Sequence, residues 1–154
     1  MSRFTVFGTM GDGAYLFDPQ GDLRASMIYP CLAPCADPLR GAVHLGVHPS
    51  TPEEVTVTND GAAPADLRPY VLKLHLRGHA NRFVWSYHFH GDATLGSGET
   101  MRVWVGRGPG GDTRLSKGMG RGSFELTDAG NAISLRSYTD AVVDCYAWGS
   151  GGRC

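Results

Sequence analysis

EEVTVTND at residues 53–60 is the first of five runs in which apolar and polar side chains alternate. Alternation with a period of two is the pattern of a strand that has one face buried and the other in water. The other runs are ADLRPYVLKLHL (65–76), FVWSYHF (83–89), TLGSGETMRVWVGRG (94–108) and FELTDAGNAISLRSYTDAVVDCYAWG (124–149). Asparagine or glycine follows the strand pattern in these runs, as is typical of turns. The series predicts short strands joined by turns.

Composition places this series in an all-β domain. The chain has 154 residues with 22 Gly and 9 Pro, and 19% of its residues are charged. This length suits one domain with a short extension, and Gly and Pro interrupt helices. We expect a sandwich of two sheets over residues 41–154, with about seven or eight strands. In the strand around residue 103, Val103 should face inward and Trp104 the opposite side.

The first 40 residues lie outside the series and form a separate extension. Strands are predicted at 3–7, 14–18 and 23–28, and DPQGD at 18–22 has turn chemistry between the last two. We therefore expect an N-terminal β-hairpin. The segment YPCLAPCADPLRG (29–41) contains three Pro and two Cys, which predicts a constrained connector.

The order and spacing of the strands in residues 42–148 resemble the lamin tail domain, an immunoglobulin-like β-sandwich of nuclear lamins and many bacterial proteins. The resemblance implies an accessory or interaction domain without a family-wide active site. VDCYAWGSGGRC at residues 143–154 is similar to the end of actinobacterial-looking members, which carry VDxC followed by a terminal Cys. That similarity favours a bond between Cys145 and Cys154.

The four cysteines, Cys31, Cys35, Cys145 and Cys154, admit three disulfide pairings or a four-thiolate zinc site. The spacing of the first two suits a zinc knuckle, whereas the spacing of the last two does not, so disulfides are favoured. The opening residues lack the pattern of a secretion signal, which suggests synthesis in the cytoplasm. An even number of cysteines suits an oxidising setting instead, so the two observations disagree.

Six histidines raise a metal hypothesis. Pairs four residues apart, such as His75 and His79, would lie roughly 13 Å apart along a strand, too far to share one ion. His88 and His90 would share a face about 7 Å apart, and Asp92 could add a third ligand. This alternative predicts a metal-dependent ligand-binding or hydrolytic module; ordinary strand-end imidazoles are the simpler interpretation.

GRGPGGDTRLSKGMGRG (106–122) is the longest predicted loop. It lacks the GxxxxGK order of a phosphate-binding loop followed by Ser or Thr. Its basic residues could form a surface for acidic protein or nucleic acid, or simply a solvated loop. The residues of this candidate anion or partner surface are Arg102, Arg107, Arg114, Lys117 and Arg121.

These patterns favour a non-enzymatic structural or interaction protein that docks on a larger assembly or forms a homo-oligomer. A bacteriophage virion component, either a capsid decoration or a tail protein, would reconcile cytoplasmic synthesis with stapling cysteines. Nucleophilic catalysis has no support, because Ser97 lies in GSG without a strand-to-helix elbow. We expect no cofactor. We also expect no membrane partner, because no apolar run approaches the roughly 18 residues of a membrane span.

Overall fold

The computed structural model describes residues 12–29, 37–106, 108–121, 125–138 and 140–154. The described residues form strands and turns and contain no helix; accordingly, none of them belongs to a helix that could cross a membrane. The all-β prediction is confirmed. The predicted strand at 3–7, Cys31, Cys35 and Arg107 lie outside the described residues.

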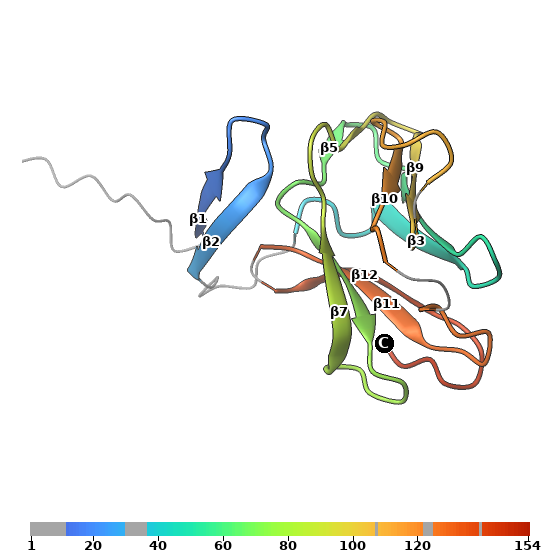
Figure 1. Ribbon diagram of the computed structural model, residues 1–154. Coiled ribbons are helices and arrows are strands. Elements are labelled where there is room, and N and C mark those ends of the chain that lie inside the picture. The colour runs from blue at the N-terminus through green and yellow to red at the C-terminus, as the bar shows by residue number, and fades with distance from the viewer. Residues whose placement is uncertain (1–11, 30–36, 107, 122–124, 139) are drawn as a thin grey trace, which may run out of the picture.

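Two four-stranded sheets form the body of the protein, and Figure 1 shows them facing each other. The first sheet has the order β10-β9-β4-β3 and the second the order β12-β11-β6-β7. The first sheet is built from β3 (Val43–His48), β4 (Glu54–Asn59), β9 (Thr100–Trp104) and β10 (Ser116–Gly118). The second is built from β6 (Val71–His75), β7 (Phe83–His88), β11 (Ala132–Arg136) and β12 (Val142–Ala147). Two short strands, β5 (Ala65–Asp66) and β8 (Thr94–Leu95), pair with each other.

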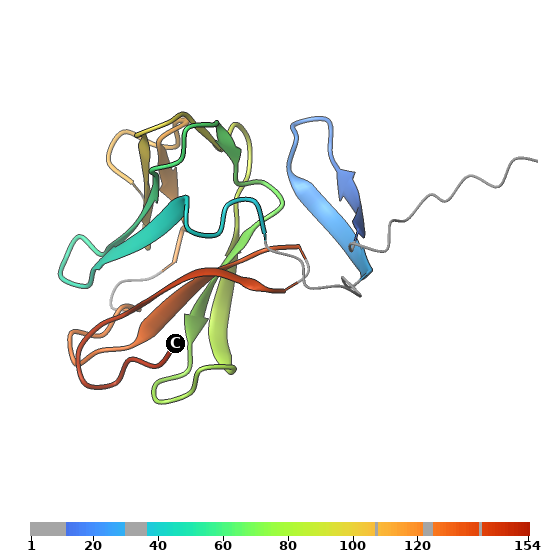
Figure 2. The same ribbon diagram turned by 180° about the vertical axis from the view of Figure 1, so that it is seen from behind.

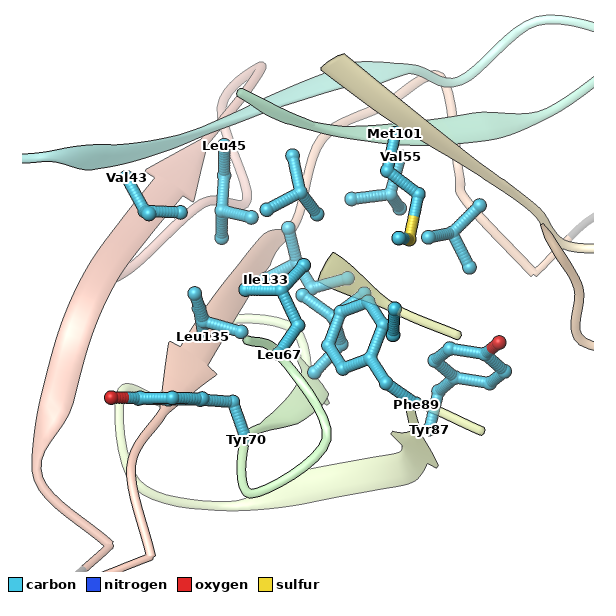
Figure 3. Close-up of a cluster of buried hydrophobic side chains, with 14 of the residues drawn as sticks. Val43, Leu45, Val55, Leu67, Tyr70, Tyr87, Phe89, Met101, Ile133 and Leu135 are labelled. Atoms are coloured by element: carbon cyan, nitrogen blue, oxygen red, sulfur yellow. The ribbon is translucent and has the colours of Figure 1, made fainter. Parts of the chain in front are cut away.

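The predicted alternation of faces places the core between the sheets. Val55 and Val57 of β4 are fully buried, as is Val103 of β9, and β4 pairs with β9 in antiparallel register. Trp85 and Tyr87 of β7 are also buried. Figure 3 shows apolar side chains from both sheets, among them Val55 and Tyr87, gathered into one cluster. The two sheets therefore share a single core, as expected for a sandwich with alternating buried and exposed faces.

A bulge lies in β7 opposite the end of β6. Leu74 pairs with Trp85, whereas His75 pairs with Phe83, so Val84 is the extra residue. Leu72 and Leu74 face the core and are buried, and Leu76, beyond the end of β6, is 37% exposed. His75 lies on the outer face beside Phe83, yet it is only 2% exposed, because the chain beyond β12 reaches it at the Arg153 carbonyl.

The two sheets are joined differently at their two edges. At one edge the Asp144 carboxylate of β12 accepts a hydrogen bond from the Leu45 amide of β3 at 2.7 Å. At the other edge the Arg121 guanidinium, beyond β10, lies 5.1 Å from the centroid of the Trp85 ring of β7. Side chains therefore hold the edges together where no backbone ladder continues.

The predicted hairpin is present as a separate two-stranded sheet, β1 (Asp12–Phe17) and β2 (Leu23–Tyr29). Its turn follows the predicted chemistry: Gly21 has a φ of +87°, and the Asp18 carboxylate accepts hydrogen bonds from the Gln20 and Asp22 amides. Figures 1 and 2 show the hairpin beside the sandwich, outside both large sheets.

Candidate functional site

The hairpin and the outer face of the second sheet line a half-open cavity of about 270 Å³. Tyr15 and Leu23 line it from the hairpin side, and the Tyr15 ring meets the Tyr138 ring edge-on at 6.1 Å between centroids. The sheet and its loops supply the remaining lining residues, Pro69, Val71, Lys73, Ser86, His88, Arg136, Ser137, Tyr138 and Asp140. Alternation explains this set, because Val71 and Lys73 face away from the core to which Leu72 contributes.

Two cations and one carboxylate dominate the polar wall of the cavity. Lys73 Nζ lies 2.8 Å from Asp140 Oδ1. Arg136 Nη1 donates to the Asp140 backbone carbonyl at 2.9 Å and lies 3.6 Å from its Oδ1. Both cations also lie over the Phe83 ring, with Lys73 Nζ 4.9 Å and Arg136 Cζ 4.7 Å from its centroid. The arrangement fixes two positive charges against a single negative one.

His88 reaches the cavity, but the proposed metal ligands do not come together. Desolvation, and then the charge of Lys73, lower the pKa of His88, so it is neutral near pH 7. His90 Nε2 instead lies 3.4 Å from Asp112 Oδ2, and Asp92 Oδ1 accepts from the Thr94 amide. Within the described ranges, no three His, Cys, Asp or Glu side chains form a group that could hold a metal ion.

The basic residues singled out in the sequence point in different directions. Arg102 lies 3.3 Å from Glu54, and Arg114 lies 2.5 Å from Glu99. The hydrogen bonds from Arg114 lower the pKa of Glu99 to about 2. Lys117 is buried at 4% exposure, because its partner in the parallel β9–β10 register is the inward-facing Val103. These side chains are thus engaged individually.

A series of buried, hydrogen-bonded side chains that the sequence did not indicate lies on the outer face of the second sheet. His75 Nε2 is 2.9 Å from Ser134 Oγ, and His75 Nδ1 is 3.0 Å from the Arg153 carbonyl. A carbonyl can only accept, so Nδ1 donates and the Ser134 hydroxyl donates to Nε2. Ser134 Oγ in turn accepts from Arg136 Nε at 3.2 Å. Alternation with Lys73 predicts that His75 faces outward, but its burial depends on the chain beyond β12, which the pattern of β6 does not indicate.

The pairing of a serine with a histidine has the hydrogen-bond order of an activated nucleophile, but its surroundings indicate a structural role. Ser134 is fully buried and His75 nearly so. The chain beyond β12 covers them: Gly78 N donates to the Gly151 carbonyl at 3.1 Å, and Cys145 forms a disulfide with Cys154. The predicted Cys145–Cys154 bond is present, and it leaves no four-thiolate zinc site. We call residues 149–154 the tail.

Each of the three tryptophans occupies its own environment. Trp104 Nε1 donates to Ser116 Oγ at 3.0 Å, and Trp148 Nε1 donates to the Thr127 carbonyl at 2.8 Å. Trp85 Nε1 is buried and has no acceptor among the described residues. Trp85 belongs to the core cluster, and Trp148 packs against that cluster.

No protein-family model and no curated protein matches this chain. Any functional assignment therefore depends on the residues and the geometry described above.

Proposed function

We propose that this protein is a non-enzymatic interaction module that docks on a larger protein assembly through its N-terminal hairpin. One observation carries the proposal: Leu16 of β1 is 63% exposed. Its register partner Ala25 and its face neighbour Ala14 are exposed as well. This outer face of the hairpin, defined by Ala14, Leu16 and Ala25, is apolar, and a protein surface of the same character is its natural partner.

The anchorage of the hairpin supports the same function. A two-stranded hairpin is marginal in water by itself, and the described residues tie this one to the sandwich by individual side-chain contacts. Asp22 Oδ1 accepts from the Gly91 amide at 2.9 Å, and Tyr15 meets Tyr138. The interface between the hairpin and the second sheet is not fully packed, because the cavity lies within it. A hairpin held in this way is available to gain further burial from a partner.

The proposal also covers the type of sandwich and the biological setting of the protein. We infer an immunoglobulin-like sandwich of the lamin tail type, supported by the two antiparallel-rich sheets and their non-sequential strand order. A bacteriophage virion component suits the Cys145–Cys154 disulfide, because such bonds persist in oxidising surroundings. The alternative of a metal-dependent module has no ligand set to support it within the described residues.

The test is site-specific photocrosslinking in the native assembly. A photoreactive amino acid at position 16 should give one defined crosslinked species, whereas the same probe at position 84, where Val84 is 54% exposed on β7, should not. A crosslink between two copies of this chain would identify a homo-oligomer as the assembly. Leu16→Glu should release the protein from the assembly without changing its melting temperature, with Val84→Glu as the matched control. Unchanged incorporation of Leu16→Glu would disprove docking through the hairpin.

A further inference from the structure

We propose that the cavity between the hairpin and the second sheet binds a small organic carboxylate whose body is apolar or aromatic. This inference concerns a ligand and does not depend on the docking function of the outer hairpin face. It rests on the size of the cavity, on the division of its walls into apolar and cationic parts, and on unused donor capacity in one of its cations.

The size and walls indicate an organic ligand. The volume of about 270 Å³ exceeds the share of liquid volume that one water takes, about 30 Å³, and suits a compact ring. The apolar walls come from opposite sides: Tyr15 and Leu23 belong to the hairpin, and Pro69 and Val71 to the sheet side. Binding sites commonly combine such walls with a few convergent polar groups.

The charge of the polar wall selects an anion. Lys73 and Arg136 are positive and Asp140 is negative, and these are the charged lining residues. His88, the remaining lining group that could become positive, is held neutral near pH 7 by desolvation and by Lys73. The wall therefore has a net charge of +1 (two cations less one carboxylate). The Asp140 side chain is 57% exposed, whereas the Arg136 side chain is only 9% exposed and faces the cavity.

Arg136 has donor capacity to spare. Its Nε donates to Ser134 and its Nη1 to the Asp140 carbonyl, whereas its Nη2 makes no hydrogen bond to any residue the structure describes. Nη2 is not among the fully buried, unpartnered side-chain atoms of the described residues, so it remains accessible to solvent or a ligand. A ligand carboxylate would bind this donor in place of water, since a planar fork matches a carboxylate in geometry and charge. The hydrogen bonds from Arg136 Nε to Ser134 and from Ser134 to His75 hold this guanidinium in place.

Calorimetry and NMR on the full-length protein test the assignment, with benzoate as the probe and benzamide as its neutral counterpart. A charge-assisted bond contributes about 1.5 kcal/mol or more, so benzoate should bind about tenfold or more tightly than benzamide. Acetate, which has the carboxylate without the ring, should bind more weakly than benzoate. Benzoate should shift the backbone amide signals of Ser86 and Ser137, which line the cavity.

Variants separate charge from shape. Lys73→Met should remove most of the preference for benzoate over benzamide, and Arg136→Met should do the same if it folds. Leu23→Trp should block the cavity without altering its charge. Arg114→Met, a remote cation that pairs with Glu99, should bind benzoate as the parent protein does. Absence of benzoate binding, equal binding of benzamide, or unaltered binding by Leu23→Trp would overturn the proposal.

Discussion

The Asp144 carboxylate accepts a hydrogen bond from the Leu45 amide at 2.7 Å and joins the last strand of one sheet to the first strand of the other. Leu45 is 7% exposed, so its amide has little access to water. A side chain thereby supplies an acceptor at an edge where the backbone ladder stops.

Asp144→Ala should lower the free energy of unfolding by about 1–3 kcal/mol, because the Leu45 amide would be buried without an acceptor. Asp144→Asn retains an oxygen acceptor and should cost less. Urea denaturation of the three proteins measures the difference. If the Ala and Asn variants unfold at the same urea concentration, the hydrogen bond does not stabilise the edge.

Val103→Asp should destabilise the protein by several kcal/mol, at least about 2–3, because an unpaired carboxylate would be forced into the core. Val103 is fully buried in the core cluster. Val84→Asp is the matched control, since the same change at a valine 54% exposed should cost less than about 0.5 kcal/mol. Thermal unfolding reports both, and equal losses would place β9 outside the core.

Replacing Cys145 and Cys154 together by Ser should reduce stability by roughly 2–3 kcal/mol on the loop-entropy estimate. The tail should also loosen locally, so the Gly78 amide, which donates to the Gly151 carbonyl, should exchange faster with deuterium. The Val57 amide, in the central strand β4, provides the internal reference. Equal acceleration at both amides would mean that the bond stabilises the whole domain and does not act through the tail.

The stability should fall as the pH drops below about 6.5, the ordinary pKa of histidine. Desolvation, and also the charge of Arg136, lower the pKa of His75 in the folded protein, so the unfolded chain takes up the proton first. Stability from this group is complete above that pH and is lost progressively toward the lower folded-state pKa. His75→Gln should flatten this part of the profile, and a superimposable profile would contradict it. The effect of Glu99, whose pKa is about 2, belongs to a separate window below its ordinary value of 4.5.

Deleting residues 1–36 should leave a cooperative thermal transition, because the hairpin forms its own sheet and the core lies in the sandwich. The cut precedes Asp37, which accepts a hydrogen bond from the Tyr70 hydroxyl at 3.1 Å, and Leu39, which packs on the core. A deletion that extends through Leu39 should be less stable. Loss of cooperativity in the shorter deletion would assign the hairpin to the core.

The sequence predicted those features that depend on neighbours along one strand. Val55, Val57 and Tyr87 alternate with polar residues, and a buried face follows from that period alone. The features that it missed depend on contacts between distant segments. The bulge at Val84 interrupts the period of β7, Ser134 meets His75 from another strand, and Lys117 turns inward because β10 pairs with β9 in parallel. No local pattern encodes such meetings, and the cavity beneath the hairpin belongs to the same category.

The separate settings of the three tryptophans give the protein three built-in optical reporters. Trp85 lies beside Arg121 at the β7 edge, Trp104 is tied to Ser116 of β10, and Trp148 is tied to Thr127 at the base of the tail. Indole emission depends on local polarity and hydrogen bonding, so single-tryptophan versions would each record a different transition. Emission from Trp148 would follow release of the tail, whereas emission from Trp85 would follow separation of the two sheets, and the order of these events on unfolding becomes directly readable.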